Sequence, residues 1–327
     1  MSAGAAGHGA AVPRRFELHG TASDQCAVAG CLLSPVPCPL QFPFRKAARE
    51  RIFPSMNAAT LHLVSLALYA LSAALLGVSM ARSDRRLPGI ATAVLGGAMV
   101  AHAAELVVYV REFHELPLVG LGPSLSVFAL LIAAGSLGLA TLGRTGPVGL
   151  VLVPVAAAVA AIAEVVGVEP SRQVLAFQGP WFVFHVVLAF LGYAGLTVAF
   201  AAGLMYLLQF RELKSKRFGA VFRFFPPLDT LDRIGRGGLV AGMAFLTLAL
   251  LVGWAWTERF GRPMSPGNPK VVWGILSWLV FAAALAARLG GGRPARRAAM
   301  ASVVGFAVVL AGYVVLRLGE AAGGAFL

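Results

Sequence analysis

Long apolar segments recur along the chain from residue 58 onward, and short connections that carry most of the charged residues separate them. Most of these segments hold about 20 residues or more, which is the length that an α-helix needs to cross a hydrocarbon core of about 30 Å. The pattern predicts an all-α fold, a polytopic integral membrane bundle of about eight transmembrane helices. We place them at about residues 58–81, 87–110, 116–142, 149–168, 181–210, 237–256, 271–287 and 298–316.

The fifth predicted helix, residues 181–210, is the longest of the eight and carries no formal charge. A basic run that begins at Arg211 follows it directly, so this end is predicted to face the cytoplasm. The ionisable side chains within the segment include His185 and Tyr193. A histidine near the outer mouth of a transmembrane helix is a candidate ligand for a metal or a haem iron.

Composition and charge narrow the class of protein. Hydrophobic residues make up 58% of the 327 residues and charged residues only 13%, too few to cover a soluble globule of this size. The net charge of +13 comes from basic residues between apolar segments, so it indicates orientation in a lipid bilayer rather than binding to nucleic acid. The three cysteines all precede residue 56. The membrane part therefore lacks thiolate ligands, and no metal other than haem iron is predicted.

Lysine and arginine residues are distributed unequally between the two sides of the predicted bundle. Fifteen fall on the side that contains the Arg211–Arg236 connection, and six fall on the other side. The positive-inside rule then places the Arg211–Arg236 loop in the cytoplasm and both ends of the bundle outside, in the cell's inner (plasma) membrane. His185 accordingly faces outward.

Residues 1–55 differ from the rest of the chain. They are rich in glycine, alanine and proline and show neither helical nor strand periodicity, which predicts a disordered N-terminal extension. They also carry six basic residues on the side that should be poor in them. Met56 is therefore an alternative start, and residues 56–327 are predicted to form the transmembrane domain.

Two intramembrane histidines, His102 and His185, are predicted in the outer half of the bilayer. An ionisable group in hydrocarbon is costly without a partner, so each either hydrogen-bonds to a neighbouring helix or ligates a cofactor. Glu105 lies on the same helix face as His102, where it either accepts the second imidazole N–H or extends to the outer interface. His62 and His114 are predicted at the membrane edges, where contact with solvent suffices.

Aromatic residues border the predicted external connection between the sixth and seventh helices, with Trp254 before it and Trp273 after it. Such residues either form an interfacial belt or line a binding surface. The sequence contains no phosphate-binding glycine loop, GxSxG nucleophile elbow or HExxH motif. This absence favours an assembly factor over an enzyme.

Two stretches of the sequence, WFVFHVVLAFLGYAGLTVAFAAGLMYLLQFRELKSK and FGRPMSPGNPKVVWGILSWLVF, resemble the cytochrome c assembly superfamily, in particular its CcsA and HemX-like branch. The resemblance covers about residues 57–320. It implies haem as the cofactor, and apocytochrome c or another cytochrome c biogenesis membrane protein as a partner. The residues that it implies in haem binding are His185, His102, Trp254, Trp273 and Lys270.

The sequence also departs from the pattern of that family. Asn268 stands where the tryptophan-rich motif has an aspartate, and Ala286 stands where a histidine is expected. The predicted function is a cytochrome c biogenesis or haem-handling membrane protein that presents or binds haem at the outer face. The alternative is a haem-free accessory or regulatory scaffold of the HemX kind. A secondary transporter is disfavoured, because no inverted repeat is evident.

Overall fold

The computed structural model describes residues 57–82, 84, 86–143, 145–170, 179–216, 219–259, 269–289 and 295–323. The predicted N-terminal extension, residues 1–55, and the alternative start at Met56 lie outside the described residues. So does most of the predicted external connection before Lys270.

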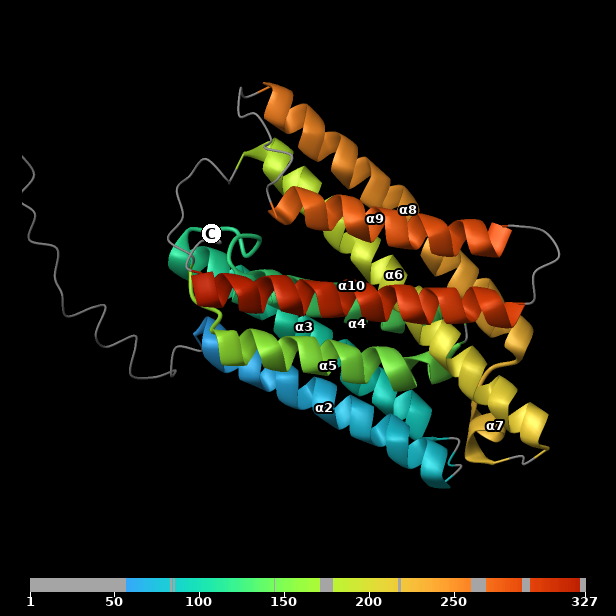
Figure 1. The fold of residues 1–327 in the computed structure, drawn as a ribbon. Helices are drawn as coiled ribbons and strands as arrows, with labels where there is room; N and C mark the ends of the chain where they lie inside the picture. The colour runs from blue at the N-terminus through green and yellow to red at the C-terminus, as the bar shows by residue number, and fades with distance from the viewer. Residues whose placement is uncertain are drawn as a thin grey trace, which may run out of the picture. The chain divides into compact units, whose positions relative to one another are not determined.

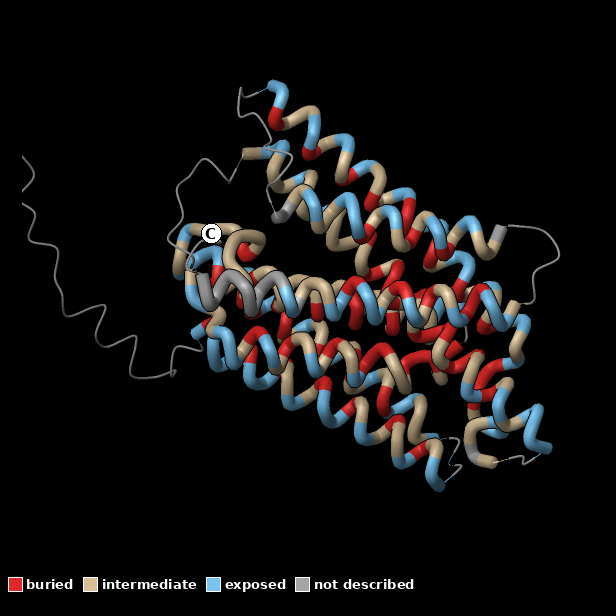
Figure 2. The backbone as a smooth tube through the Cα atoms, viewed as in Figure 1, coloured by how far each residue is buried: buried red, intermediate tan, exposed pale blue. Residues whose placement is uncertain are grey.

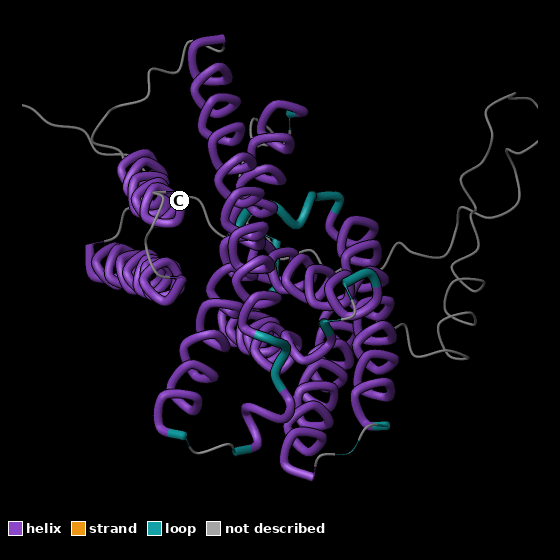
Figure 3. Tube along the Cα trace, turned by 90° about the vertical axis from the view of Figure 1, so that its right-hand side faces the viewer, coloured by secondary structure: helices purple, strands orange, loops and turns teal. Residues whose placement is uncertain are grey.

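Eight helices in the described ranges are long and apolar enough to cross a membrane, and these ranges contain no β-strand (Figure 1 and Figure 3). The all-α polytopic bundle that the sequence predicts is thereby confirmed. The helices are α2 (Ala58–Arg82), α3 (Leu87–Phe113), α4 (Leu121–Thr141), α5 (Gly149–Val166, which the 3-10 turn Gly146–Val148 precedes), α6 (Pro180–Ser215), α8 (Leu228–Arg259), α9 (Pro269–Leu289) and α10 (Ala295–Gly323), with the short α7 (Ala220–Phe224) between α6 and α8.

The helices α6 and α8 extend well beyond their predicted apolar segments. The α6 helix continues to Ser215 and α8 begins at Leu228, so most of the predicted Arg211–Arg236 loop is helical. Hydropathy marks only the part of a helix that lies in hydrocarbon. Residues such as Arg211 and Lys214 have good helix propensity and extend α6 into the polar region beyond it.

The α6 helix takes part in both apolar clusters of the described bundle. In the first cluster, residues of α6 such as Met205 pack with residues of α2, α3, α4 and α5. In the second, Leu196 of α6 packs with α8, α9 and α10. Figure 2 shows buried residues along the sides on which the helices face one another. The helix that carries His185 is therefore held from both sides.

Glycines allow α6 and α8 to approach closely. A Cβ atom at Gly195 of α6 would lie 2.9 Å from the Cα of Gly242 on α8, and a Cβ at Gly242 would lie 2.9 Å from the carbonyl oxygen of Gly192. Real Cβ atoms do not approach backbone atoms this closely. The sequence pattern of small residues in the fifth span is thus a packing feature, as is common between membrane helices.

Candidate functional site

His185 lies in the second turn of α6, against α8. Its Nδ1 is 2.7 Å from the carbonyl oxygen of Ala249. A carbonyl oxygen only accepts, so Nδ1 carries the hydrogen and donates, and the Nε2 of a neutral imidazole keeps a free lone pair. The ring also packs on Gly253, where a Cβ atom would lie 2.8 Å from Nδ1 and Cε1. An N–H bond to a backbone carbonyl is how proteins orient a histidine that ligates a metal through its other nitrogen.

Exposed aromatic side chains lie at the same end of α6 and α8 as His185. Trp254 follows Gly253 in α8 and is 61% exposed, and Trp181 and Phe184 of α6 are also exposed. Phe182 and Trp256 pair across the two helices, with ring centroids 6.2 Å apart. This end of the α6–α8 pair therefore offers an apolar, aromatic surface beside one imidazole.

Of the two α9 residues predicted in the site, the structure describes the side chain of Trp273 only. The ring of Trp273 packs on the ring of Tyr313 in α10 at a centroid distance of 5.9 Å, and a Cβ at Gly312 would lie 2.9 Å from it. Lys270 lies in the first turn of α9, and its side chain lies outside the described part of the structure.

His102 belongs to a set of five fully buried polar side chains, which we call the buried polar cluster: His62 and Tyr69 of α2, His102 and Glu105 of α3, and Ser126 of α4. Tyr69 Oη lies 3.0 Å from His102 Nδ1, and His102 Nε2 lies 2.8 Å from Ser126 Oγ. Ser126 Oγ donates to Glu105 Oε1 at 3.0 Å. Glu105 Oε1 in turn lies 2.9 Å from His62 Nδ1.

The hydrogen bonds around His102 determine its tautomer. A hydroxyl has a single hydrogen to donate, and Ser126 donates it to Glu105. The Oγ of Ser126 therefore accepts from His102 Nε2, and His102 Nδ1 accepts from the Tyr69 hydroxyl. Both ring nitrogens are satisfied and the side chain is fully buried. In this arrangement haem iron has no free nitrogen to bind at His102, in contrast to His185.

His62 and Glu105 form a buried pair that shares one proton. The Nε2 of His62 is 3.0 Å from the carbonyl oxygen of Ala160 in α5, so Nε2 carries a hydrogen. The contact between His62 Nδ1 and Glu105 Oε1 then needs one further proton, on either atom. The pair is neutral overall in both cases. Glu164 lies at the edge of the cluster, with Oε2 3.9 Å from His62 Nε2 and a side chain that is 33% exposed.

The structure corrects two expectations at this site. The prediction that His62 is solvated at the membrane edge is wrong, because α3 and α5 cover this turn of α2 and leave His62 fully buried. The alternative in which Glu105 extends to the outer interface is also wrong, since Glu105 is fully buried among α2, α3 and α4. His114, by contrast, is exposed after the end of α3, as predicted.

Sequence reasoning missed Tyr69, Ser126 and the role of His62. A signal was present in α2, where buried polar residues recur three, four or seven positions apart and so lie on one helix face. They are His62, Ser65, Tyr69, Ser72 and Ser79. A polar stripe on a transmembrane helix indicates a face turned toward protein rather than lipid.

The structure does not bring His102 and His185 together. His102 contacts Tyr69 and Ser126 from α2 and α4, whereas His185 contacts α8. In the described part of the chain the two sets of contacts share no residue. A single haem clamped between these two imidazoles is therefore not the arrangement in this structure.

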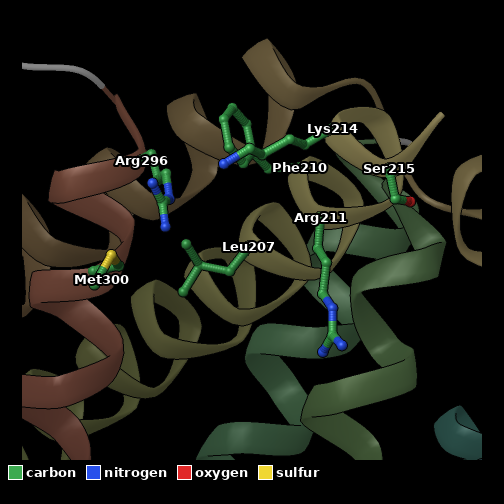
Figure 4. A pocket seen from close by; sticks show the side chains of 7 residues that line it. All are labelled: Leu207, Phe210, Arg211, Lys214, Ser215, Arg296 and Met300. Carbon is green, nitrogen blue, oxygen red and sulfur yellow. The ribbon is translucent and has the colours of Figure 1, made fainter.

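A cavity of about 580 Å³ lies at the opposite end of α6 from His185, between α6 and α10 (Figure 4). Leucine, phenylalanine and methionine side chains form part of its lining, and three cations surround them. The guanidinium carbon of Arg296 lies 5.5 Å from the centroid of the Phe210 ring. The lining residues are Leu207, Phe210, Arg211, Lys214, Ser215, Arg296 and Met300. This concentration of cations is typical of the cytoplasmic interface of a membrane protein.

Comparisons with known proteins agree with this architecture. The chain is 27% identical over 277 residues to the cytochrome c biogenesis protein CcsA of Synechococcus elongatus, an alignment that covers 71% of this chain and 85% of that protein. It is 30% identical over 141 residues to the CcsA protein of Chlamydomonas reinhardtii, covering 43% of this chain but only 39% of that relative. The family described as cytochrome c assembly protein matches residues 59–321. This match spans all eight membrane-length helices in whole or in large part, and the chain therefore belongs to the cytochrome c assembly protein family.

Proposed function

We propose that this chain acts in cytochrome c biogenesis by binding haem at the outer ends of α6 and α8 and presenting it for attachment to an apocytochrome c. Family membership and similarity to CcsA proteins support the role in biogenesis. The observation that carries the haem site is the state of His185: Nδ1 is held by the Ala249 carbonyl, and Nε2 is left for a ligand.

In this proposal the residues of the site have distinct tasks. His185 ligates the haem iron, and Trp254, which is exposed next to Gly253, provides apolar surface for the macrocycle. Lys270 and Trp273 contribute from α9, where a lysine can pair with a haem propionate. Bound haem would supply the group that is transferred. The chain itself orients the ligand nitrogen.

The first test is the absorption spectrum of the purified protein with haem. Wild-type chain is expected to retain haem and show a Soret band, and His185→Ala is expected to retain at least about tenfold less, since even the loss of a residue that only orients a ligand costs about 10–100-fold in metal affinity. Gly253→Ala should also shift the spectrum, because the added Cβ would meet the His185 ring at 2.8 Å.

His114→Asn is the matched control for this test. It removes another histidine at an exposed position, and asparagine tolerates the left-handed backbone found there, with φ of 54°. Its haem content should equal that of the wild type. A wild-type chain that takes up no haem would instead support the haem-free scaffold, and an unchanged spectrum of His185→Ala would remove His185 from the site.

We further propose that the protein lies in the inner (plasma) membrane with the Arg211–Arg236 segment in the cytoplasm and the α8–α9 connection outside. The asymmetry of basic residues and the cationic cavity near Lys214 support this orientation. Single cysteines at Ser215 and Ser265, in a chain without its three native cysteines, should react differently with a membrane-impermeant thiol reagent. We expect labelling of intact cells only at position 265. Labelling only at position 215 would invert the proposed topology.

A further inference from the structure

We infer that the buried polar cluster is a binding site for a divalent transition-metal ion of the Zn²⁺ and Co²⁺ class, with His62, His102 and Glu105 as its ligands. Each of these residues offers a ligand atom, and the three atoms lie within 4.8 Å of one another. The two imidazole rings stand edge to face, with centroids 5.8 Å apart. This inference rests on residues other than His185 and does not depend on haem binding.

One atom of the cluster is left without a partner. Glu105 Oε2 is buried and has no hydrogen-bond partner in the described structure. The Nε2 of His102 is 3.5 Å from it, too far for a good hydrogen bond. An unsatisfied carboxylate oxygen in a membrane interior is costly. A cation placed between Oε2 and the two rings would satisfy it.

Each histidine also has a partner for the nitrogen that would not ligate. The Nε2–H of His62 donates to the Ala160 carbonyl, which leaves Nδ1 to face the metal. His102 Nδ1 lies 3.0 Å from Tyr69 Oη, and a hydroxyl can accept as well as donate. When His102 Nε2 binds a metal, the ring hydrogen would move to Nδ1, the Tyr69 hydroxyl would turn its own hydrogen away, and the Tyr69 oxygen would accept a hydrogen bond from Nδ1–H. Such outer hydrogen bonds are the usual support of metal-ligating histidines.

The chemistry of the three ligands selects the class of ion. Two imidazoles and one carboxylate suit Zn²⁺ and other divalent transition metals, whereas Mg²⁺ and Ca²⁺ prefer oxygen ligands throughout. Binding would expel the proton that His62 and Glu105 share, and the carboxylate would then offset part of the charge of the ion. Glu164, partly exposed and 3.9 Å from His62, lies at the edge of the cluster. An arriving cation would meet this carboxylate first.

The test is a titration of the purified full chain with Co²⁺, whose visible d–d absorption reports its ligands. The chain should carry no polyhistidine tag and should be treated with a chelator beforehand. Serines should replace the cysteines, because thiolates bind Co²⁺; these are Cys26, Cys31 and Cys38. We expect one Co²⁺ per chain, with Zn²⁺ displacing it.

Variants distinguish the residues that would ligate the metal from a residue that supports a ligand through a hydrogen bond. Glu105→Gln and His62→Gln should weaken Co²⁺ binding by more than about 100-fold, and Tyr69→Phe by about 10–100-fold, the range for loss of an outer hydrogen bond. His114→Asn and His185→Ala should bind Co²⁺ as the wild type does. Size-exclusion chromatography of each variant separates loss of binding from loss of the fold, and Tyr69→Phe keeps the packed ring.

Two results would overturn the inference. The first is a wild-type chain that binds no Co²⁺ at this stoichiometry. The second is Co²⁺ affinity and spectrum that stay unchanged in the folded Glu105→Gln and Tyr69→Phe variants. If His185→Ala loses haem but keeps Co²⁺, the haem site and the metal site are separate. A chain that fails to bind haem but still binds Co²⁺ would reject the proposed function and leave the metal site standing.

Discussion

Replacement of Glu105 by leucine is expected to lower the free energy of unfolding by about 3–5 kcal/mol, the range found when one partner of a buried ionic pair is removed. Glu105 Oε1 is the common partner of Ser126 and His62, and all three side chains are fully buried. Leucine leaves His62 Nδ1 and the Ser126 hydroxyl without this partner in a region that water does not reach. Glu105→Gln, which keeps an acceptor oxygen, should cost much less.

Denaturant or thermal unfolding in detergent measures this effect. Glu258→Leu is the matched control, since Glu258 is exposed in the last turns of α8, and its effect should stay within about 0.5 kcal/mol. In the double variant with His62→Leu, the loss should be smaller than the sum of the single losses by about 0.5–3 kcal/mol. Strict additivity would show that the two side chains do not act as a pair.

Alanine at Gly242 is expected to destabilise the described bundle by about 1–3 kcal/mol or more. The new Cβ would lie 2.9 Å from the Gly192 carbonyl oxygen and from Leu196 Cγ. The carbonyl oxygen belongs to the backbone of α6 and cannot turn away as a side chain can. The two helices must therefore move apart, and this separation disrupts the packing between α6 and α8 along their length.

Gly237 provides the control on the same helix. A Cβ there meets nothing within 4 Å, and alanine has a better helix propensity than glycine by about 0.8–1.0 kcal/mol. The sign of the effect should therefore differ: Gly237→Ala is neutral or stabilising, and Gly242→Ala destabilises. Because Gly195 and Gly242 meet at the same crossing, the double alanine variant should lose less than the sum of the single losses. A stabilised Gly242→Ala protein would contradict the close crossing.

The α6–α8 crossing also bears on the proposed haem site. His185 of α6 is oriented by Ala249 and Gly253 of α8, so its ring direction depends on how the two helices are placed along each other. A separation at Gly242 should weaken haem retention as well as the fold. The buried polar cluster lies among α2, α3, α4 and α5, so its Co²⁺ affinity in the same variant should change less than haem retention.

The helices themselves could be predicted from the sequence. An apolar run of about 20 residues satisfies its backbone internally and has only one stable form in a bilayer, so the eight spans follow from local composition. Hydropathy does not show where a helix ends outside the hydrocarbon. The extension of α6 to Ser215 and the start of α8 at Leu228 depend on helix propensity and on packing between neighbouring helices.

The same distinction between local sequence and tertiary packing applies to the candidate site. The sequence by itself identified His185 and the aromatic residues near it, since a lone histidine in a long uncharged span stands out from its surroundings. Only the tertiary structure decided that His102 is saturated by Tyr69 and Ser126, and that His62 is buried against Glu105. These partners come from α2, α3 and α4, separated by 21 to 43 residues in the chain. Helix periodicity reports which face a residue occupies, but not which helix covers that face, and the pairing of buried polar groups is set by the latter.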